Sequence, residues 1–202
     1  MRFARTCVAK VNPRKISGPW LEGFVLDLHT LKSEPIGTGP SGRTLFNTTY
    51  SEVGGLLRRL KYDGEKNAAP EIIEAAAAFW MQARTRIDMI IPVPASTYRV
   101  WQPVQLLADG IGAGLKIPVV DCIKTTRPPA KLKDISDPEK RKELLTGLYT
   151  LAPEATAGKN VLLFDDLYRS GSTMNAITTV LLAEGKAASV RAFAITCTRS
   201  IR

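Results

Sequence analysis

The segment from residue 161 to residue 185 limits the possible folds of this chain more than any other part of the sequence. It opens with four apolar residues, 161–164, which predict a strand that is buried on both faces. Asp165 and Asp166 follow, at the point where we expect this strand to end. After a short polar turn the apolar spacing becomes that of a helix, which ends at Gly185. A strand that leads directly into a helix is the unit from which parallel α/β sheets are built.

The turn between this strand and helix has the composition of a phosphate-binding site. Its residues are Arg169, Ser170, Gly171, Ser172 and Thr173. They place three hydroxyls and a small glycine at a helix N-terminus, where free N–H groups and the helix dipole favour anions. The two carboxylates before the turn can hold sugar hydroxyls or face a hydrated Mg²⁺ ion. The segment therefore predicts a site for a ribose with a 5-phosphate. The alternative is an acid pair at an ordinary strand end, followed by a serine cap.

The remaining pattern predicts an α/β fold with a doubly wound, mainly parallel sheet and helices on both faces, because strand and helix patterns alternate from about residue 70 onward. The expected helices are 51–64, 71–84, 100–111 and 174–181, and the expected strands are 87–94, 117–123, 148–151, 161–166 and 190–197. Residues 1–50 are rich in glycine, proline and threonine. We expect them to form a small β-rich cap on a core of residues 51–202.

Composition narrows the class of protein. The three cysteines form no CxxC pair, which suits free thiols and a cytoplasmic location. No apolar run approaches the ~18 residues of a membrane span, and the N-terminus lacks the apolar core of a signal peptide. The net charge of +9 suits a polyanionic partner, either nucleic acid or a highly phosphorylated small substrate. Because the positive charge is spread along the chain without a basic stripe, nucleic acid is not favoured.

Two further polar segments are candidates for anion binding. The first follows the expected strand 87–94 and contains Ala95, Ser96, Thr97, Tyr98 and Arg99. Its hydroxyls, N–H groups and guanidinium suit an oxyanion, although the same residues can simply begin a helix with a hydroxyl cap. The second, residues 124–146, is too long and polar for a simple connector and suits an active-site lid. Its candidate basic residues are Lys131, Lys133 and Arg141, and the alternative is a solvated charged loop.

The segment 161–173 resembles the phosphoribosyl-pyrophosphate (PRPP) binding motif of type I phosphoribosyltransferases, in which an apolar strand, two acidic residues and a hydroxyl-rich turn around a glycine follow one another. Over about residues 51–200 the chain also resembles the ComF-like phosphoribosyltransferases, a family named for a competence protein of DNA uptake. The segments that carry this second resemblance are 60–64, 91–94 with Arg99, 102–108 and 132–145. Many ComF relatives begin with a four-cysteine zinc module. Only Cys7 lies in the N-terminal half here, so we expect no structural zinc.

The resemblance implies the type I phosphoribosyltransferase fold and the transfer of a phosphoribosyl group from PRPP to a nitrogen acceptor, with release of pyrophosphate and Mg²⁺ as cofactor. The acceptor would be a nucleobase or another nitrogen nucleophile, and the sequence does not identify it. Related folds commonly dimerise, but the sequence leaves the oligomeric state open. Asp165 and Asp166 would hold the ribose hydroxyls or Mg²⁺, through water or PRPP, and residues 169–173 would hold the 5-phosphate. Residues 95–99 with Lys131 would bind pyrophosphate, and Lys133 and Arg141 would act in catalysis.

Two other functions stay open at this point. The same fold can serve as a non-catalytic module that binds PRPP or a nucleotide for regulation, or that takes part in DNA uptake through partner contacts. A nucleic-acid binder driven by the positive charge is the third, and it requires a steep salt dependence of affinity.

Overall fold

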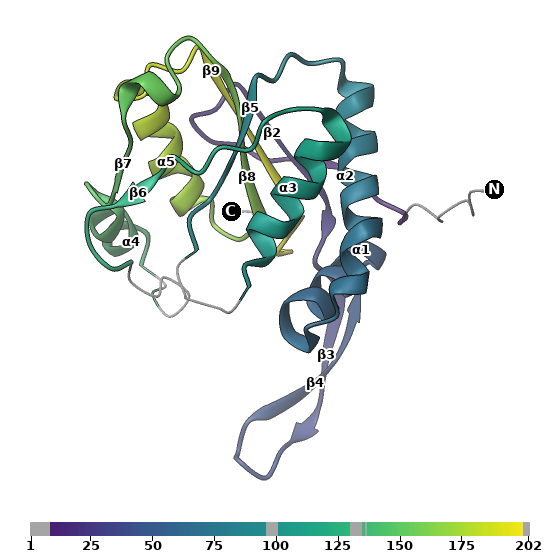
Figure 1. Cartoon of the computed structure of the whole chain (residues 1–202). Helices are drawn as coiled ribbons and strands as arrows, with labels where there is room; N and C mark the ends of the chain where they lie inside the picture. The colour runs from purple at the N-terminus through teal and green to yellow at the C-terminus, as the bar shows by residue number, and fades with distance from the viewer. Residues whose placement is uncertain (1–8, 96–100, 130–134, 136, 200–202) are drawn as a thin grey trace, which may run out of the picture.

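A five-stranded sheet forms the centre of the computed structural model, which describes residues 9–95, 101–129, 135 and 137–199 (Figure 1). In spatial order its strands are β1 (Arg14–Lys15), β2 (Glu22–Leu28), β9 (Ser189–Cys197), β8 (Asn160–Tyr168) and β5 (Met89–Pro92). All neighbouring pairs are parallel except β1 with β2. The mainly parallel sheet is therefore confirmed. The expected strand 117–123 contributes only an isolated bridge between Val119 and Ile90.

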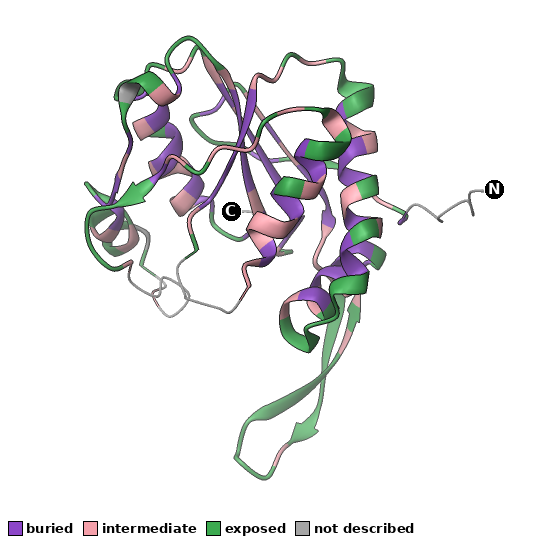
Figure 2. Ribbon diagram, viewed as in Figure 1, coloured by how far each residue is buried: buried purple, intermediate pink, exposed green. Residues whose placement is uncertain are grey.

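Helices cover both faces of the sheet, as the doubly wound pattern predicted. The helices on one face are α1 (Glu52–Arg58), α2 (Ala69–Ala83) and α3 (Pro103–Leu115). They pack on Leu162, Phe164 and Phe193 of the central strands. Helix α5 (Ser172–Ala183) packs on the other face, against Val161 and Leu163. Figure 2 shows the buried stripe of each helix turned toward the sheet. Successive residues of β8 thus enter two different apolar cores, because side chains alternate along a strand.

The boundaries of the first helix agree with its sequence signals. The Ser51 hydroxyl caps α1 by accepting from the Gly54 N–H at 3.0 Å, and Gly64 ends the helical segment in a left-handed conformation with φ +73°. Between α1 and Gly64 the chain forms a π-helical turn, η1 (Arg59–Asp63), that the sequence pattern did not predict. A short 3-10 turn, η2 (Lys66–Ala68), leads into α2.

Helix α3 continues through glycines 110, 112 and 114, where we expected a helix to lose its pattern. A methyl group at Gly110 would collide with Ile73 of α2, and one at Gly112 would collide with Val119. These glycines are therefore sites of close packing, and the tertiary contacts outweigh the low helix propensity of glycine.

The polar stretch 124–146 is more ordered than a lid loop in its described residues. Strand β6 (Lys124–Thr125) pairs antiparallel with β7 (Tyr149–Thr150), which confirms the returning strand. Between them lies helix α4 (Pro138–Leu145), which Asp137 caps by accepting from the Glu139 N–H at 3.0 Å. The expectation of loop structure throughout 124–146 is therefore wrong for Lys124–Thr125 and for Pro138–Leu145. A 3-10 turn, η4 (Pro153–Ala155), follows β7.

The N-terminal region contributes to two sheets. Strands β1 and β2 belong to the central sheet, whereas β3 (Thr30–Thr38) and β4 (Thr44–Tyr50) form a separate hairpin that extends away from the body of the molecule (Figure 1). The region that we expected to form a cap therefore contributes two strands to the core sheet and one separate hairpin. Among the residues that the structure describes, no helix is both long enough and apolar enough to cross a bilayer.

Candidate functional site

The turn between β8 and α5 places hydroxyl groups at a helix N-terminus. Gly171 precedes the helix with φ +74°, a conformation that favours glycine. A methyl group at this position would also collide with the Tyr168 ring, so both the backbone and the packing require glycine. The Gly171 carbonyl accepts from the Asn175 N–H at 2.7 Å, which starts the helix. The Ser170 and Ser172 hydroxyls lie 3.0 Å apart in a hydrogen bond. The first N–H groups of α5 have no acceptor within the helix and are directed at this turn.

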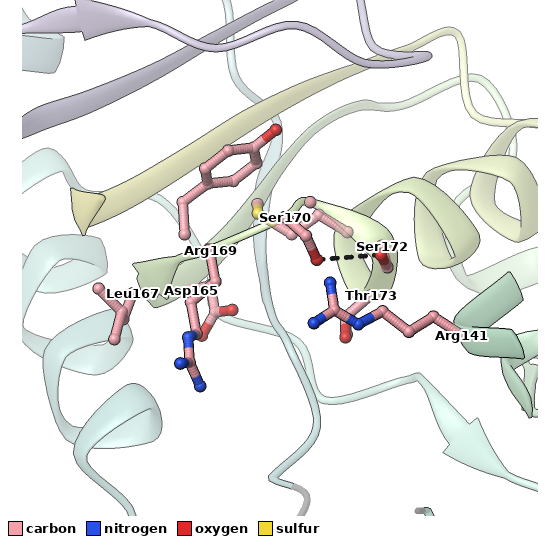
Figure 3. Close-up of a pocket in the computed structure, with 10 residues that line it drawn as sticks. Arg141, Asp165, Leu167, Arg169, Ser170, Ser172 and Thr173 are labelled. Carbon is pink, nitrogen blue, oxygen red and sulfur yellow. Dashed lines mark hydrogen bonds between the residues drawn. The ribbon is translucent and has the colours of Figure 1, made fainter. Parts of the chain in front are cut away.

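A cavity of about 210 Å³ lies beside this turn. Its lining includes all five residues of the predicted phosphate turn together with Asp165 and Arg141 (Figure 3). Leu167, Tyr168 and Met174 complete it. The volume is below the roughly 300–1,000 Å³ of pockets for drug-sized ligands, so it suits a small polar group such as a sugar phosphate. The structure therefore brings together seven of the residues that the sequence singled out.

Arg141 approaches the cavity from α4 and not from a loop. Its Nε donates to the Ile135 carbonyl at 2.6 Å, and Figure 3 shows its guanidinium directed toward Thr173 and the phosphate turn. We expected this arginine over the pyrophosphate, and the structure places it on the same cavity as the predicted phosphate turn. The sequence pattern also missed Tyr149 of β7, whose buried phenol is hydrogen-bonded to the Thr173 side chain. Burial raises the pKa of Tyr149, so the phenol stays neutral.

The two aspartates lie within β8 and not beyond its end. The strand continues because Leu167 and Tyr168 pair with Thr196 and Cys197 of β9, so the expected end at residue 166 is wrong. Consecutive strand residues point to opposite faces of a sheet. Asp165 lines the cavity on the α5 side, whereas Asp166 is buried toward α1. The pair that we expected to act on one ligand is therefore divided between two faces.

The carboxyl group of Asp165 holds its proton more tightly than an ordinary aspartate does, because its pKa is raised. Burial, and then the negative charge of Asp166, raise its pKa from 3.8 to about 7. The Asp166 N–H, which donates to Asp165 Oδ1 at 2.8 Å, and the Lys61 ammonium oppose this rise without cancelling it. Near neutral pH the protonated and ionised forms are therefore both populated. A cation in the cavity would favour the ionised form.

Asp166 is held in an ion pair by Lys61 of the π-helical turn η1. The Nζ–Oδ1 distance is 2.8 Å, and the two side chains are only 15% and 8% exposed. His29 lies near this pair, with its Nδ1 3.2 Å from the Thr196 hydroxyl and its ring edge-to-face with Tyr50. Burial and then the charge of Lys61 lower the pKa of His29, which keeps its ring neutral at pH 7. The only sequence signal for Lys61 was the segment 60–64, which we noted for its resemblance to ComF-like proteins.

Of the other predicted anion-binding residues, the structure describes only Ala95. Ala95 is exposed and follows the end of β5 by three positions. Ser96, Thr97, Tyr98, Arg99, Lys131 and Lys133 lie outside the described residues. Their predicted contacts with pyrophosphate stay predictions.

The cavity fits a hydrated Mg²⁺ ion only with help from a ligand. Among the described residues, no group of three or more histidine, cysteine, aspartate or glutamate side chains could hold a metal ion. Of the two predicted carboxylates, Asp165 faces the cavity and Asp166 is already neutralised by Lys61. Mg²⁺ is commonly bound by one or two carboxylates, several waters and the oxygens of a phosphorylated substrate. One carboxylate beside a phosphate turn suits this mode.

Comparison with known proteins gives similarity at the level of the fold. No protein-family model matches the sequence, and no curated protein sequence matches it. The adenine phosphoribosyltransferase of Trypanosoma brucei in complex with AMP, pyrophosphate and ribose-5-phosphate is 14% identical over 87% of this chain and 83% of that chain, with a TM-score of 0.49. A hypothetical protein from Neisseria gonorrhoeae with bound ppGpp is 18% identical over 68% of this chain and 71% of that chain, with a TM-score of 0.45.

A longer enzyme also matches. The glutamine PRPP amidotransferase from B. subtilis, complexed with ADP and GMP, is 16% identical over 73% of this chain and has a TM-score of 0.43. The match covers 28% of that enzyme, so the chain spans less than a third of its length.

Proposed function

We propose that this chain is a Mg²⁺-dependent phosphoribosyltransferase that binds PRPP and transfers its phosphoribosyl group to a nitrogen acceptor. The observation that carries the proposal is the composition of the cavity. A hydroxyl-rich helix N-terminus, an arginine from a second helix and a single carboxylate line the same small space. These are the groups that a sugar carrying a phosphate and a metal-bound pyrophosphate would contact.

The 5-phosphate would bind at the start of α5. Ser170, Ser172 and Thr173 supply hydroxyls there, and the first N–H groups of the helix point at the same position. Arg141 would add a charge-assisted hydrogen bond from α4. Tyr149 would hold the Thr173 side chain in place by its hydrogen bond.

Asp165 would bind the ribose hydroxyls or a water on Mg²⁺. The metal, when bound, would neutralise the pyrophosphate and orient it for departure. In the transfer, the bond between the anomeric carbon and a pyrophosphate oxygen breaks and a bond to the acceptor nitrogen forms. The chain's own part is to orient PRPP and exclude water. Residues 95–99, Lys131 and Lys133 would bind the pyrophosphate, as the family resemblance implies.

The test is calorimetric titration of PRPP into the whole chain, with and without Mg²⁺. We expect Mg²⁺-dependent binding that Asp165→Asn weakens about tenfold or more, because a hydrogen bond to a charged group is worth about 1.5–3 kcal/mol. The matched control is Asp109→Asn, which removes an exposed carboxylate on α3 that hydrogen-bonds only Gln105 among the contacts observed. Equal PRPP affinity of Asp165→Asn and the parent would show that the site is wrongly assigned.

A second titration isolates the phosphate turn. Ribose 5-phosphate carries no pyrophosphate, so its binding should not need Mg²⁺. Ser172→Ala should weaken it, whereas Ser33→Ala in the hairpin should leave it unchanged. If Ser172→Ala bound ribose 5-phosphate as tightly as the parent, the phosphate would have to lie elsewhere.

Turnover separates an enzyme from a PRPP-binding regulatory module. Release of pyrophosphate from PRPP in the presence of a set of nucleobases would support transfer. Tight, Mg²⁺-dependent PRPP binding without release in any mixture would favour the non-catalytic alternative.

A further inference from the structure

The β3–β4 hairpin is a two-stranded ribbon without a core of its own. Among the described residues, neither strand pairs with anything except the other, and nearly all of their side chains are exposed (Figure 2). Its large apolar side chains Leu31, Ile36, Leu45 and Phe46 are 46%, 65%, 49% and 55% exposed. An isolated two-stranded ribbon is only marginally stable in water. The hairpin therefore gains stability from any surface that covers it.

The two edges of the hairpin differ in their capacity to pair with another strand. The β3 edge contains Pro35, which has no N–H, and the charged residues Lys32 and Glu34. Its register with β4 also shifts near Leu31 and again near Ile36. These are the features by which proteins block edge-to-edge pairing. Strand β4 has none of them, because residues 44–51 contain neither a charge nor a proline.

We propose that β4 is the interface for a second copy of this chain, whose β4 pairs with it antiparallel about a two-fold axis. The chain carries a net charge of +9, so two copies repel each other except where charge is absent or complementary. An antiparallel pair of β4 strands places uncharged residues opposite one another. The result is a four-stranded sheet in the order β3, β4, β4 of the second copy and β3 of the second copy.

The charges at the two ends of β4 complement each other in this arrangement. Arg43 precedes β4 and Glu52 follows it, so antiparallel pairing brings the Arg43 end of one copy toward the Glu52 end of the other. Two positively charged residues of the same copy lie near Glu52. Arg58 lies over the Tyr50 ring and is already paired with Asp63 at 2.8 Å, and the backbone N–H of Lys10 donates to Glu52 Oε2 at 3.0 Å. Opposite charges therefore meet at both ends of the paired strands. A nucleic acid fits β4 poorly, because the strand offers no positive side chain to phosphates.

Sedimentation over a range of protein concentrations tests the interface, with Phe46→Lys compared with Ile36→Lys. Both variants replace an exposed apolar side chain of the hairpin by lysine, but only Phe46 lies in β4. We expect the parent and Ile36→Lys to dimerise alike. Phe46→Lys should raise the dimer dissociation constant at least about tenfold, because like charges lie near each other across paired strands. A monomeric parent, or equal dissociation of both variants, would overturn the proposal.

Cysteine cross-linking tests the register without adding charge. Asn47 lies at the middle of β4, so Asn47→Cys should form an interchain disulfide on oxidation that is absent in the parent, because paired strands bring Cβ atoms within disulfide range. Ile36→Cys on β3 should not. The reverse pattern, or dimer formation that requires DNA or RNA, would reject β4 pairing. The interface is independent of the proposed enzymatic function, so Phe46→Lys should bind PRPP as the parent does.

Discussion

Asp165 links the stability of the chain to pH. Its folded pKa of about 7 exceeds its ordinary value of 3.8, so the folded state binds this proton more tightly than the unfolded state does. Below about pH 4 Asp165 is protonated in both the folded and the unfolded state, so its raised pKa does not lower the free energy of unfolding. As the pH rises from about 4 to 7 the unfolded chain ionises first, and folding stability is lost until both states are ionised.

Asp165→Asn should therefore stabilise the chain above pH 7 and have little effect near pH 4. A rise of the Asp165 pKa from 3.8 to about 7 is worth about 4 kcal/mol. Solvent in the cavity should reduce the gain in stability to about 1–3 kcal/mol. Urea denaturation of the parent and the variant at pH 4.5 and pH 8 measures this difference. An equal difference at the two pH values would show that Asp165 titrates normally in the folded chain. If Asp165→Asn is more stable at pH 8 but binds PRPP more weakly, then Asp165 lowers the stability of the folded chain and serves binding, as expected of a residue in a binding site.

Gly171 is the second residue whose role can be measured alone. Gly171→Ala should destabilise the chain and weaken ribose 5-phosphate binding, because the new methyl group meets the Tyr168 ring as well as an unfavourable φ of +74°. Gly158→Ala is the matched control, since Gly158 has φ +69° and open space around its Cβ position. The left-handed backbone costs about 1–3 kcal/mol in both variants. Chemical denaturation should show a larger loss for Gly171→Ala, and equal losses would mean that the Tyr168 contact is relieved at no cost.

At the scale of elements, the π-helical turn η1 directs Lys61 at Asp166 of the neighbouring strand. π-Helical turns are rare and occur often at functional sites. Lys61→Met should destabilise the chain by about 3 kcal/mol, the lower end of the range for breaking a buried pair, because a carboxylate is left buried without its cation. Asp166→Asn in the Lys61→Met background should recover most of this loss. Urea denaturation of the four members of this cycle measures the coupling.

An exposed ion pair of the same segment is the control for Lys61. Arg58 and Asp63 lie 2.8 Å apart but are 42% and 35% exposed, so Arg58→Met should cost at most about 1 kcal/mol. If Lys61→Met lowered the free energy of unfolding no more than Arg58→Met does, solvent would have to screen the Lys61–Asp166 pair. Lys61 would then not be what holds Asp166 in place.

The sequence predicted the elements better than their ends. Apolar runs identified β5, β8 and β9, and the hydroxyl of Ser51 and the left-handed Gly64 marked the first helical segment. The end of β8 was misplaced because two aspartates look like the end of a buried strand, whereas pairing with β9 continues for two residues beyond them. Helix α4 was missed because its residues are charged and it shows little apolar periodicity. Its order comes from a cap and from contact with the body of the molecule.

The sequence predicted those residues of the candidate site that lie in one continuous segment of the chain. It did not predict the contacts between segments that are far apart in the sequence. Residues 169–173 and Asp165 lie in one segment, so the strand–turn–helix pattern fixed their arrangement. The Lys61–Asp166 pair joins positions 105 residues apart, and no local pattern encodes such a contact. The division of the two carboxylates between faces follows from the alternation of strand side chains once Asp165 and Asp166 are known to lie inside β8.

At the scale of the whole molecule, β8 connects two cores and the cavity lies at its end. Its odd-numbered residues Val161 and Leu163 pack under α5, and its even-numbered residues Leu162 and Phe164 pack under α1–α3. A ligand at Asp165 and the turn therefore binds to the strand on which both cores depend. The β3–β4 hairpin stands outside both cores, because none of its residues belongs to either cluster.

Hydrogen exchange should separate these two parts of the chain. Amides of β8 and β9 lie in the centre of the sheet and are expected to exchange through global unfolding, whereas hairpin amides exchange through local opening. PRPP with Mg²⁺ at 100 times its dissociation constant stabilises the folded state by about 2.7 kcal/mol, which slows exchange through global unfolding about 100-fold. We therefore expect slower exchange in β8, β9 and the start of α5, and unchanged exchange in residues 30–50. Asp109→Asn should behave as the parent and Asp165→Asn should lose most of the protection. Protection of the hairpin instead of the sheet on adding PRPP would place PRPP away from the cavity, since a ligand in the cavity does not slow the local opening of the hairpin.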